Sequence, residues 1–224
     1  AADEIEDPIR RASALNRVAT ELAQRDRLGD AKKLLKEVRR TAEQIEQPAL
    51  RVPELARMGY IHARYLDNRN AAIACLGECE ELADQVDPER PEDAVAAKLL
   101  LAYTYHGLQM TDQADALLER TLAEAARLED PRKRTDLTAD AAAYLHKMKR
   151  DAQADAAFQQ AETFAEAIQE PLTRAHALVH LSQQLRTAGK SEAADQVLDQ
   201  AETLADQVDN SLRGTLLNKI RDAR

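Results

Sequence analysis

The stretch that decides the fold runs from residue 168 to residue 207, IQEPLTRAHALVHLSQQLRTAGKSEAADQVLDQAETLADQ. An acidic residue followed by a proline stands near its start, and proline suits the first turn of a helix because its missing N–H has no partner there. About 17 residues later, the break AGKSE supplies Gly and Ser, which are typical of the end of one helix and the start of the next. The pattern predicts a hairpin of two helices, each about 16–18 residues and about 25 Å long.

The same pattern recurs along the whole chain. Prolines stand at positions 8, 48, 91, 131 and 171 and Ser at 211, in steps of 40, 43, 40, 40 and 40 residues. The breaks RDRLGD, LDNRN, LQMTD, MKRD and AGKSE each follow one of these prolines. A fixed period of this length is the sequence mark of a repeat protein. We therefore expect one repeat domain over 1–224, with hairpins at roughly 8–47, 48–87, 91–130, 131–170 and 171–210 and a capping helix at 211–224.

Aligning the hairpins on their breaks reveals a regular alternation of small and large side chains. The first helix has one small position: Ala19, Gly59, Ala102, Ala142 and Ser182. The second helix has two, which are Ala31, Ala72, Ala114, Ala154 and Ala194, and then Val38, Cys79, Thr121, Ala161 and Ala201. Between these lies a large position: Leu35, Leu76, Leu118, Phe158 and Leu198. Small residues let paired helices approach, and the large one fills the groove between them, so the sequence predicts an all-α solenoid.

The composition narrows the classes of function. The chain of 224 residues has a net charge of −9, 44% hydrophobic residues and only 3% aromatic residues, without Trp. This charge argues against nucleic acid as a partner, because binding phosphates requires a basic excess. The basic clusters at 10–11, 32–33 and 132–134 have acidic neighbours, and we interpret them as solvated helix faces. No run of about 20 apolar residues predicts membrane insertion.

The small and large positions resemble those of the tetratricopeptide repeat, and the resemblance covers essentially the whole chain. It implies a right-handed superhelix of helical hairpins whose first helices line a concave face that binds partner peptides. Two departures are clear, because the step is about 40 residues rather than the 34 usual in that family, and the family's aromatic residues are mostly replaced. HEAT-type hairpins are the alternative.

The first residues look like the end of a second helix. ADEIEDP at 2–8 overlays AEQIEQP at 42–48, so we expect residues 1–6 to be the tail of a preceding helix. Two readings stay open for the localisation: a cytoplasmic piece of a longer protein, or an exported mature chain cut after an Ala-x-Ala site.

Motifs that carry chemistry are lacking. There is no phosphate-binding glycine loop and no nucleophile elbow, so we expect no enzyme and no cofactor. His176 and His180 have the spacing of two metal ligands on one helix face but no third ligand, so we expect no metal. Cys75 and Cys79 are interpreted as buried packing thiols. A recurrent arginine early in the first helices is expected to reach the end of the preceding hairpin: Arg11, Arg51, Arg134 and Arg174.

When the first helices are aligned with the repeat of that family, the resemblance implies a set of groove residues on them: Tyr60, Arg64, Tyr103, His106, His146, Lys147, His176, Gln183 and Arg186. The first hairpin adds Asn16, Thr20 and Gln24. This basic and aromatic set predicts a protein-interaction scaffold that clamps an acidic segment or a C-terminal carboxylate. Ordinary solvated surface is the plainer interpretation. The alternative function is a structural module that self-associates through its repeat ends.

Overall fold

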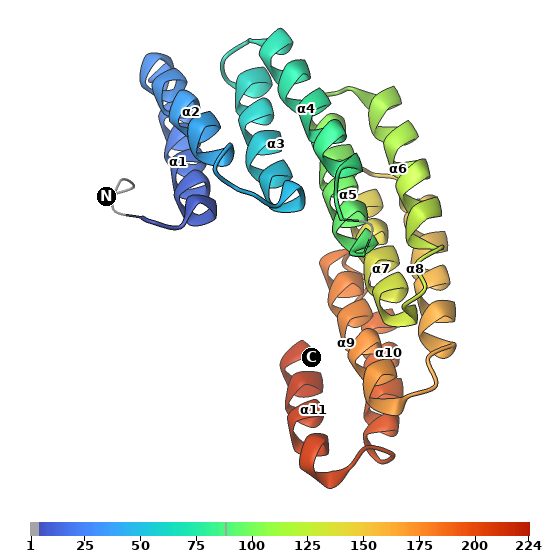
Figure 1. The fold of residues 1–224 in the computed structure, drawn as a ribbon. Helices are drawn as coiled ribbons and strands as arrows, with labels where there is room; N and C mark the ends of the chain where they lie inside the picture. The colour runs from blue at the N-terminus through green and yellow to red at the C-terminus, as the bar shows by residue number, and fades with distance from the viewer. Residues whose placement is uncertain (1–4, 88) are drawn as a thin grey trace. The chain divides into compact units, whose positions relative to one another are not determined.

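The computed structural model describes residues 5–87 and 89–224, and over these residues it contains eleven α-helices and no strand (Figure 1). The helices are α1 Pro8–Gln24, α2 Leu28–Ala42, α3 Pro48–Arg64, α4 Arg69–Asp84, α5 Pro91–Gly107, α6 Thr111–Ala125, α7 Pro131–Lys147, α8 Asp151–Glu166, α9 Pro171–Thr187, α10 Ser191–Ala205 and α11 Asn210–Ala223.

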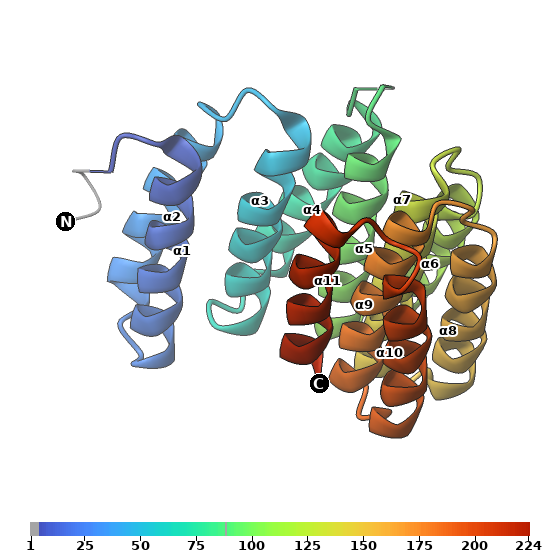
Figure 2. The ribbon, with the colours of Figure 1, turned by 90° about the horizontal axis from the view of Figure 1, so that it is seen from below.

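The chain divides into two compact units, residues 1–119 and 120–224, with the boundary inside α6. In the first unit α1 packs on α2 and α3 on α4, while α1, α3 and α5 also contact each other in succession. In the second unit α7 packs on α8 and α9 on α10, and α7, α9 and α11 form the matching succession (Figures 1 and 2). Both units are thus built from stacked helical hairpins. The expected all-α architecture of stacked helical hairpins is confirmed, whereas the single domain over 1–224 stays a prediction.

The helix starts follow the expected cap chemistry. Asp7 accepts hydrogen bonds from the backbone N–H groups of Ile9 and Arg10, with Pro8 at the first helical position. Asp130 and Glu170 cap α7 and α9 in the same way. Each carboxylate satisfies donors that a helix start otherwise leaves free. The recurrent acid–proline pair therefore fixes where these first helices begin.

Each hairpin turn contains one residue with a left-handed backbone. These residues are Asp26, Asp67, Gln109, Lys149 and Gly189, with φ values between 48° and 72°. Only glycine adopts this conformation without a steric penalty. The turn geometry is therefore repeated even though four of the five residues are not glycine.

The small positions are buried in the contacts between helices. Ala19, Ala102 and Ala142 have no exposed surface, and Leu76 and Leu198 from the large position are equally buried. At Gly59 a Cβ would lie 3.2 Å from the Cβ of Cys75 in α4, which shows how closely α3 and α4 approach. These contacts explain why the alternation of sizes predicts the fold.

The recurrent arginines have different partners. Arg51 behaves as expected, because its Nε and Nη2 donate to the carbonyl of Ile45, the end of the preceding hairpin, at 3.1 and 2.6 Å. Arg134 instead lies over the ring of Phe164 in its own hairpin, 4.9 Å from the centroid. One sequence position therefore serves two structural roles.

The two ends of the described chain differ in detail from expectation. Residues 1–4 of the predicted helix tail lie outside the described residues, and Ile5 and Glu6 are not helical. In α11 Leu216 and Ile220 are buried, as a capping helix requires, but Leu212 is 47% exposed. Over residues 5–87 and 89–224, no helix has both the length and the apolar character to cross a membrane.

Candidate functional site

In the first unit the groove residues expected from the sequence lie on α1, α3 and α5. Arg64 and Tyr103 are exposed, and Tyr60 and His106 are half-buried. The expectation that Asn16 lines the groove is wrong, because Asn16 is fully buried between α1 and α3. Its amide donates to the carbonyl oxygen of Glu54 at 3.0 Å and to the carboxylate of Glu54 at 2.7 Å. Asn16 therefore links two hairpins and does not line a groove.

Contacts around Tyr60 and Tyr65 join the first helices of this unit, and we call this set of contacts the aromatic seam. Gln24 of α1 donates to the hydroxyl of Tyr65 at 3.2 Å, and the Tyr65 ring meets the Tyr60 ring edge-on with centroids 6.3 Å apart. Gly107 of α5 lies against Tyr60, since a Cβ there would be 3.5 Å from its ring. The seam therefore crosses α1, α3 and α5 at the carboxyl ends of these helices. Sequence reasoning missed Tyr65, although it follows Tyr60 by just over one helical turn.

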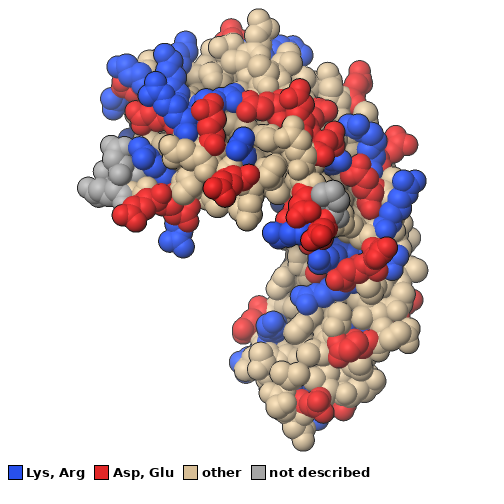
Figure 3. All heavy atoms as spheres, in the orientation of Figure 1, with Lys and Arg blue, Asp and Glu red and all other residues tan. Residues whose placement is uncertain are grey.

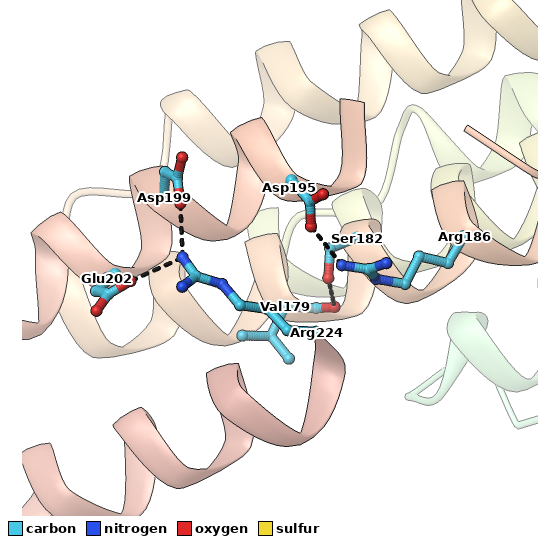
Figure 4. Close-up of polar contacts among 7 residues, drawn as sticks. All are labelled: Val179, Ser182, Arg186, Asp195, Asp199, Glu202 and Arg224. Carbon is cyan, nitrogen blue, oxygen red and sulfur yellow. Dashed lines mark hydrogen bonds and ion pairs between the residues drawn. The ribbon is translucent and has the colours of Figure 1, made fainter. Parts of the chain in front are cut away.

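In the second unit two of the expected basic side chains have acidic partners within their own hairpins. His146 lies 2.9 Å from a carboxylate oxygen of Asp151. Arg186 pairs with Asp195 of α10 at 2.5 Å (Figure 4). Lys147 differs, because it is exposed and lies over the ring of Tyr144 at 5.4 Å. Unlike His146 and Arg186, Lys147 therefore keeps its positive charge available.

Further along the same two helices, toward the start of α7, α7 and α9 form a polar cluster. His180 Nε2 lies 2.8 Å from Asp140 Oδ1, and Arg132 Nε lies 3.5 Å from Asp136 Oδ2. The second carboxylate oxygen of Asp136 is buried, and no described residue donates a hydrogen bond to it. A buried acceptor without a donor is costly in free energy, so this oxygen is the chemically unusual atom of the cluster.

The electrostatics of the cluster follow from its burial and its charges. Burial favours neutral His180, but the hydrogen bond and charge of Asp140, with the charge of Asp136, raise the pKa of His180 overall. Burial also raises the pKa of Asp136, against the opposing charges of His180 and Arg132. The pKa of His176 is lowered by burial and by the cations of Lys219 and Arg132. The pKa values of His176 and His180 are therefore shifted in opposite directions from the ordinary value of histidine.

Sequence reasoning missed Asp136 and Asp140, and the repeat itself contained the signal. Asp140 and His180 occupy equivalent positions one step of 40 residues apart, and the stacking of α7 on α9 brings equivalent positions together. The groove set was chosen without acids, whereas the structure places the carboxylates of Asp136 and Asp140 near His180. The site in this unit is therefore of mixed charge.

The two cysteines are buried in the packing of the first unit. Cys75 and Cys79 are buried free thiols, and Cys79 Sγ lies 3.7 Å from the Val52 carbonyl. Burial raises the pKa of both thiols, which opposes reactivity. Within the part of the chain that the structure describes, no three His, Cys, Asp or Glu side chains are grouped so that they could hold a metal ion.

Comparison with known proteins supports the fold and goes no further. The sequence matches no protein-family model and no curated protein sequence. Ton1535 from Thermococcus onnurineus NA1 is similar in structure with a TM-score of 0.64 and 17% identity, over 93% of this chain and 57% of Ton1535. A putative kinesin light chain of Podosopora anserina with nearly identical TPR-like repeats is 18% identical over 92% of this chain and 100% of its own, at a TM-score of 0.44. The chain thus spans little more than half the length of Ton1535, and at this identity the likeness concerns the fold alone.

Proposed function

We propose that the protein is an interaction scaffold whose first helices bind an extended segment of a partner protein. One observation carries this proposal: the Asp136 side chain is 26% exposed, and its buried carboxylate oxygen has no hydrogen-bond donor among the described residues. An extended polypeptide has a free backbone N–H at every residue except proline, and such a donor would remove the free-energy cost at Asp136 once the carboxylate rotates toward the surface. His180, which pairs with Asp140 at 2.8 Å, lies on α9 near Asp136.

The spacing along α7 fits a segment rather than a single small molecule. Asp136 and Lys147 are eleven residues apart, which is about 16 Å along a helix axis. Five residues of an extended peptide cover this distance. Lys147 would then meet an acidic side chain or a C-terminal carboxylate of the partner, while Gln183 of α9, which is exposed, offers further hydrogen bonds.

In the first unit the aromatic seam supports the same kind of function. Tyr60 and Tyr103 offer ring surface with few rotatable bonds, and Arg64 offers an exposed guanidinium group. Tyrosine and arginine are the residues that protein interfaces favour, because they combine contact area with directed hydrogen bonds. We propose that this face binds its own part of the partner.

A screen of peptides tests the proposal. The chain is exposed to an array of random ten-residue peptides with free C-termini, and hits are measured again by isothermal titration calorimetry. Lys147→Glu/Gln183→Glu should weaken a hit from the second unit at least about tenfold, because it reverses the available charge and adds a second acid. Lys149→Glu, an exposed change in the neighbouring turn, is the matched control and should leave the affinity within about twofold.

Two results would contradict the proposal. One is the absence of any hit that the first-helix variants weaken, although circular dichroism shows their helices intact. The other is light scattering in which the mass rises with concentration and the same variants abolish the rise, because the first helices would then serve self-association instead.

A further inference from the structure

The second helices differ sharply in charge, and α2 stands apart. It carries five basic and two acidic residues, a net charge of +3. The helices α4 and α6 each carry one basic and four acidic residues, and α8 and α10 carry four acidic residues and no basic one. Figure 3 shows Lys and Arg side chains gathered over the first hairpin. In a chain of net charge −9, this local excess calls for a physical role.

The basic side of α2 forms one wall of a groove. The groove measures 610 Å³ and lies between α2 and α4, with Met58 and His62 of α3 at its floor. Lys32, Lys36 and Arg40 line it from α2. Apolar atoms of Leu35, Met58 and Ala74 complete the lining. A groove of this size that combines apolar lining atoms with polar and charged side chains is typical of ligand sites.

The charges of this wall are available. No carboxylate of the described residues lies within ion-pair distance of Lys32, Lys36 or Arg40. Arg39 is different, because it pairs with Glu78 of α4 and donates to Cys75 Sγ at 3.5 Å. The pKa of His62 at the floor is lowered by burial and by the cations of Arg39 and Lys32, which is consistent with a positive potential in the groove.

The second unit contains the equivalent groove with the opposite charge. It lies between α8 and α10 over Leu181 and Leu185 of α9 and measures 300 Å³. Asp155, Gln159 and Glu162 line it 123 positions after Lys32, Lys36 and Arg39, and Leu181 and Leu185 follow Met58 and His62 by the same number. Asp155 is itself paired with Lys190 at 2.6 Å. An equivalent groove is therefore present in each unit, and of these two grooves the one in the first unit is basic.

From this difference we propose that the groove between α2 and α4 is a second binding site, which takes an acidic segment of a partner protein. Lys32, Lys36 and Arg40 follow one another every four residues, about 6 Å apart along the helix. Carboxylates spaced by one turn of a helix, or by two residues of an extended strand, match this interval. The apolar atoms of Leu35, Met58 and Ala74 would accommodate one aliphatic side chain of the same segment. The site lies on the second helices and does not depend on the function proposed for the first helices.

A model peptide tests this inference with the full chain. The probe is the eight-residue peptide EELEELEE with blocked ends, titrated in a calorimeter in 50 mM and in 300 mM NaCl. We expect measurable binding at the lower salt concentration, at least about tenfold weaker at the higher one, because exposed charges are screened. Lys32→Glu/Lys36→Glu should weaken binding at least about thirtyfold.

The control variant is Lys33→Glu/Lys149→Glu, which changes the net charge equally. Lys33 is 81% exposed on α2 and, like Lys149, does not line the groove. This variant should change the affinity less than about threefold, and so should Lys147→Glu on the first helices. Circular dichroism of each variant verifies that its helices are intact.

Three outcomes would overturn the inference. The first is no binding in 50 mM NaCl. The second is an equal loss in the groove variant and in the control variant, which would indicate a general effect of net charge. The third is a twelve-nucleotide single-stranded RNA that binds through Lys32 and Lys36 more tightly than the peptide, because the groove would then select phosphates.

Discussion

The buried pair of Asn16 and Glu54 should contribute measurably to the stability of the first unit. Asn16→Ala removes a hydrogen bond of 2.7 Å to a carboxylate and one of 3.0 Å to a carbonyl. Such bonds stabilise by about 2 and about 1 kcal/mol. The change also removes the Asn16 Oδ1, a buried acceptor without a donor among the described residues, which returns about 1 kcal/mol. The net loss is about 2 kcal/mol.

A double-mutant cycle isolates the contact between the two side chains. The free energy of unfolding in urea is measured for the wild type, Asn16→Ala, Glu54→Ala and the double variant, with hydrogen exchange of α1 and α3 amides as a local readout. The coupling energy should be about 2 kcal/mol, the value for the bond to the carboxylate, because terms that belong to one residue alone cancel. Arg17→Ala, an exposed neighbour on α1, should stay within about 0.5 kcal/mol of the wild type.

A coupling energy below about 0.5 kcal/mol would refute this reasoning. It would mean that water replaces the Asn16 amide at Glu54 without cost, and that the contact between α1 and α3 rests on its apolar side chains alone.

Three further predictions concern pH, thiol reactivity and backbone conformation. Because the pKa of His180 is raised, its stabilising contribution should be complete below its ordinary value of 6.5 and be lost as the pH rises through the folded pKa; urea unfolding between pH 5 and 9 should show this loss, reduced in Asp140→Asn. Cys79 should react with a thiol reagent at least about a hundredfold more slowly in the folded protein than in urea, since it has no exposed surface and its pKa is raised; equal rates would contradict its burial. Gly189→Ala should destabilise the protein by about 1 kcal/mol, because φ is 72° at this residue. Gly77→Ala lies in the interior of α4 with no atom near the added Cβ, and it should stabilise the protein by up to about 1 kcal/mol. Thermal unfolding of both variants tests these two expectations.

Most of the fold could be predicted because the repeat carries redundant information. The step between prolines, the turn residues and the small positions each indicate the same hairpins, so an error in one is corrected by the others. Asp130 before Pro131 illustrates this, because the cap and the proline mark one helix start independently. The bounds of the helices differ from the predicted hairpins by only a few residues.

The candidate site was harder to predict because it depends on partners that are distant in sequence. The helical phase places Asn16 on the groove side, yet Glu54, 38 residues later, draws it into the core. Arg186 looked available until the fold placed Asp195 of α10 next to it. Polar pairs of this kind leave no periodic trace, since they occur in one hairpin and not in the next.

The basic groove shows the same limit from another side. The sequence KK at 32–33 was interpreted as a solvated face, and this describes Lys33, which is 81% exposed. Lys32 is one position further round the helix and lines the groove with Lys36. A cluster along the chain thus separates into two faces with different surroundings, and only the positions of α3 and α4 distinguish them.

The equivalence of Lys32 and Asp155 suggests how such a protein can change its ligands. Ala31 and Leu35, which hold α2 in place, are buried, and their counterparts Ala154 and Phe158 are buried as well. The residues that set the sign of a groove are interleaved with these framework residues but are exposed to solvent. Mutation can therefore invert the charge of one groove while the neighbouring hairpins keep theirs, so that the surface charge evolves hairpin by hairpin on a constant architecture.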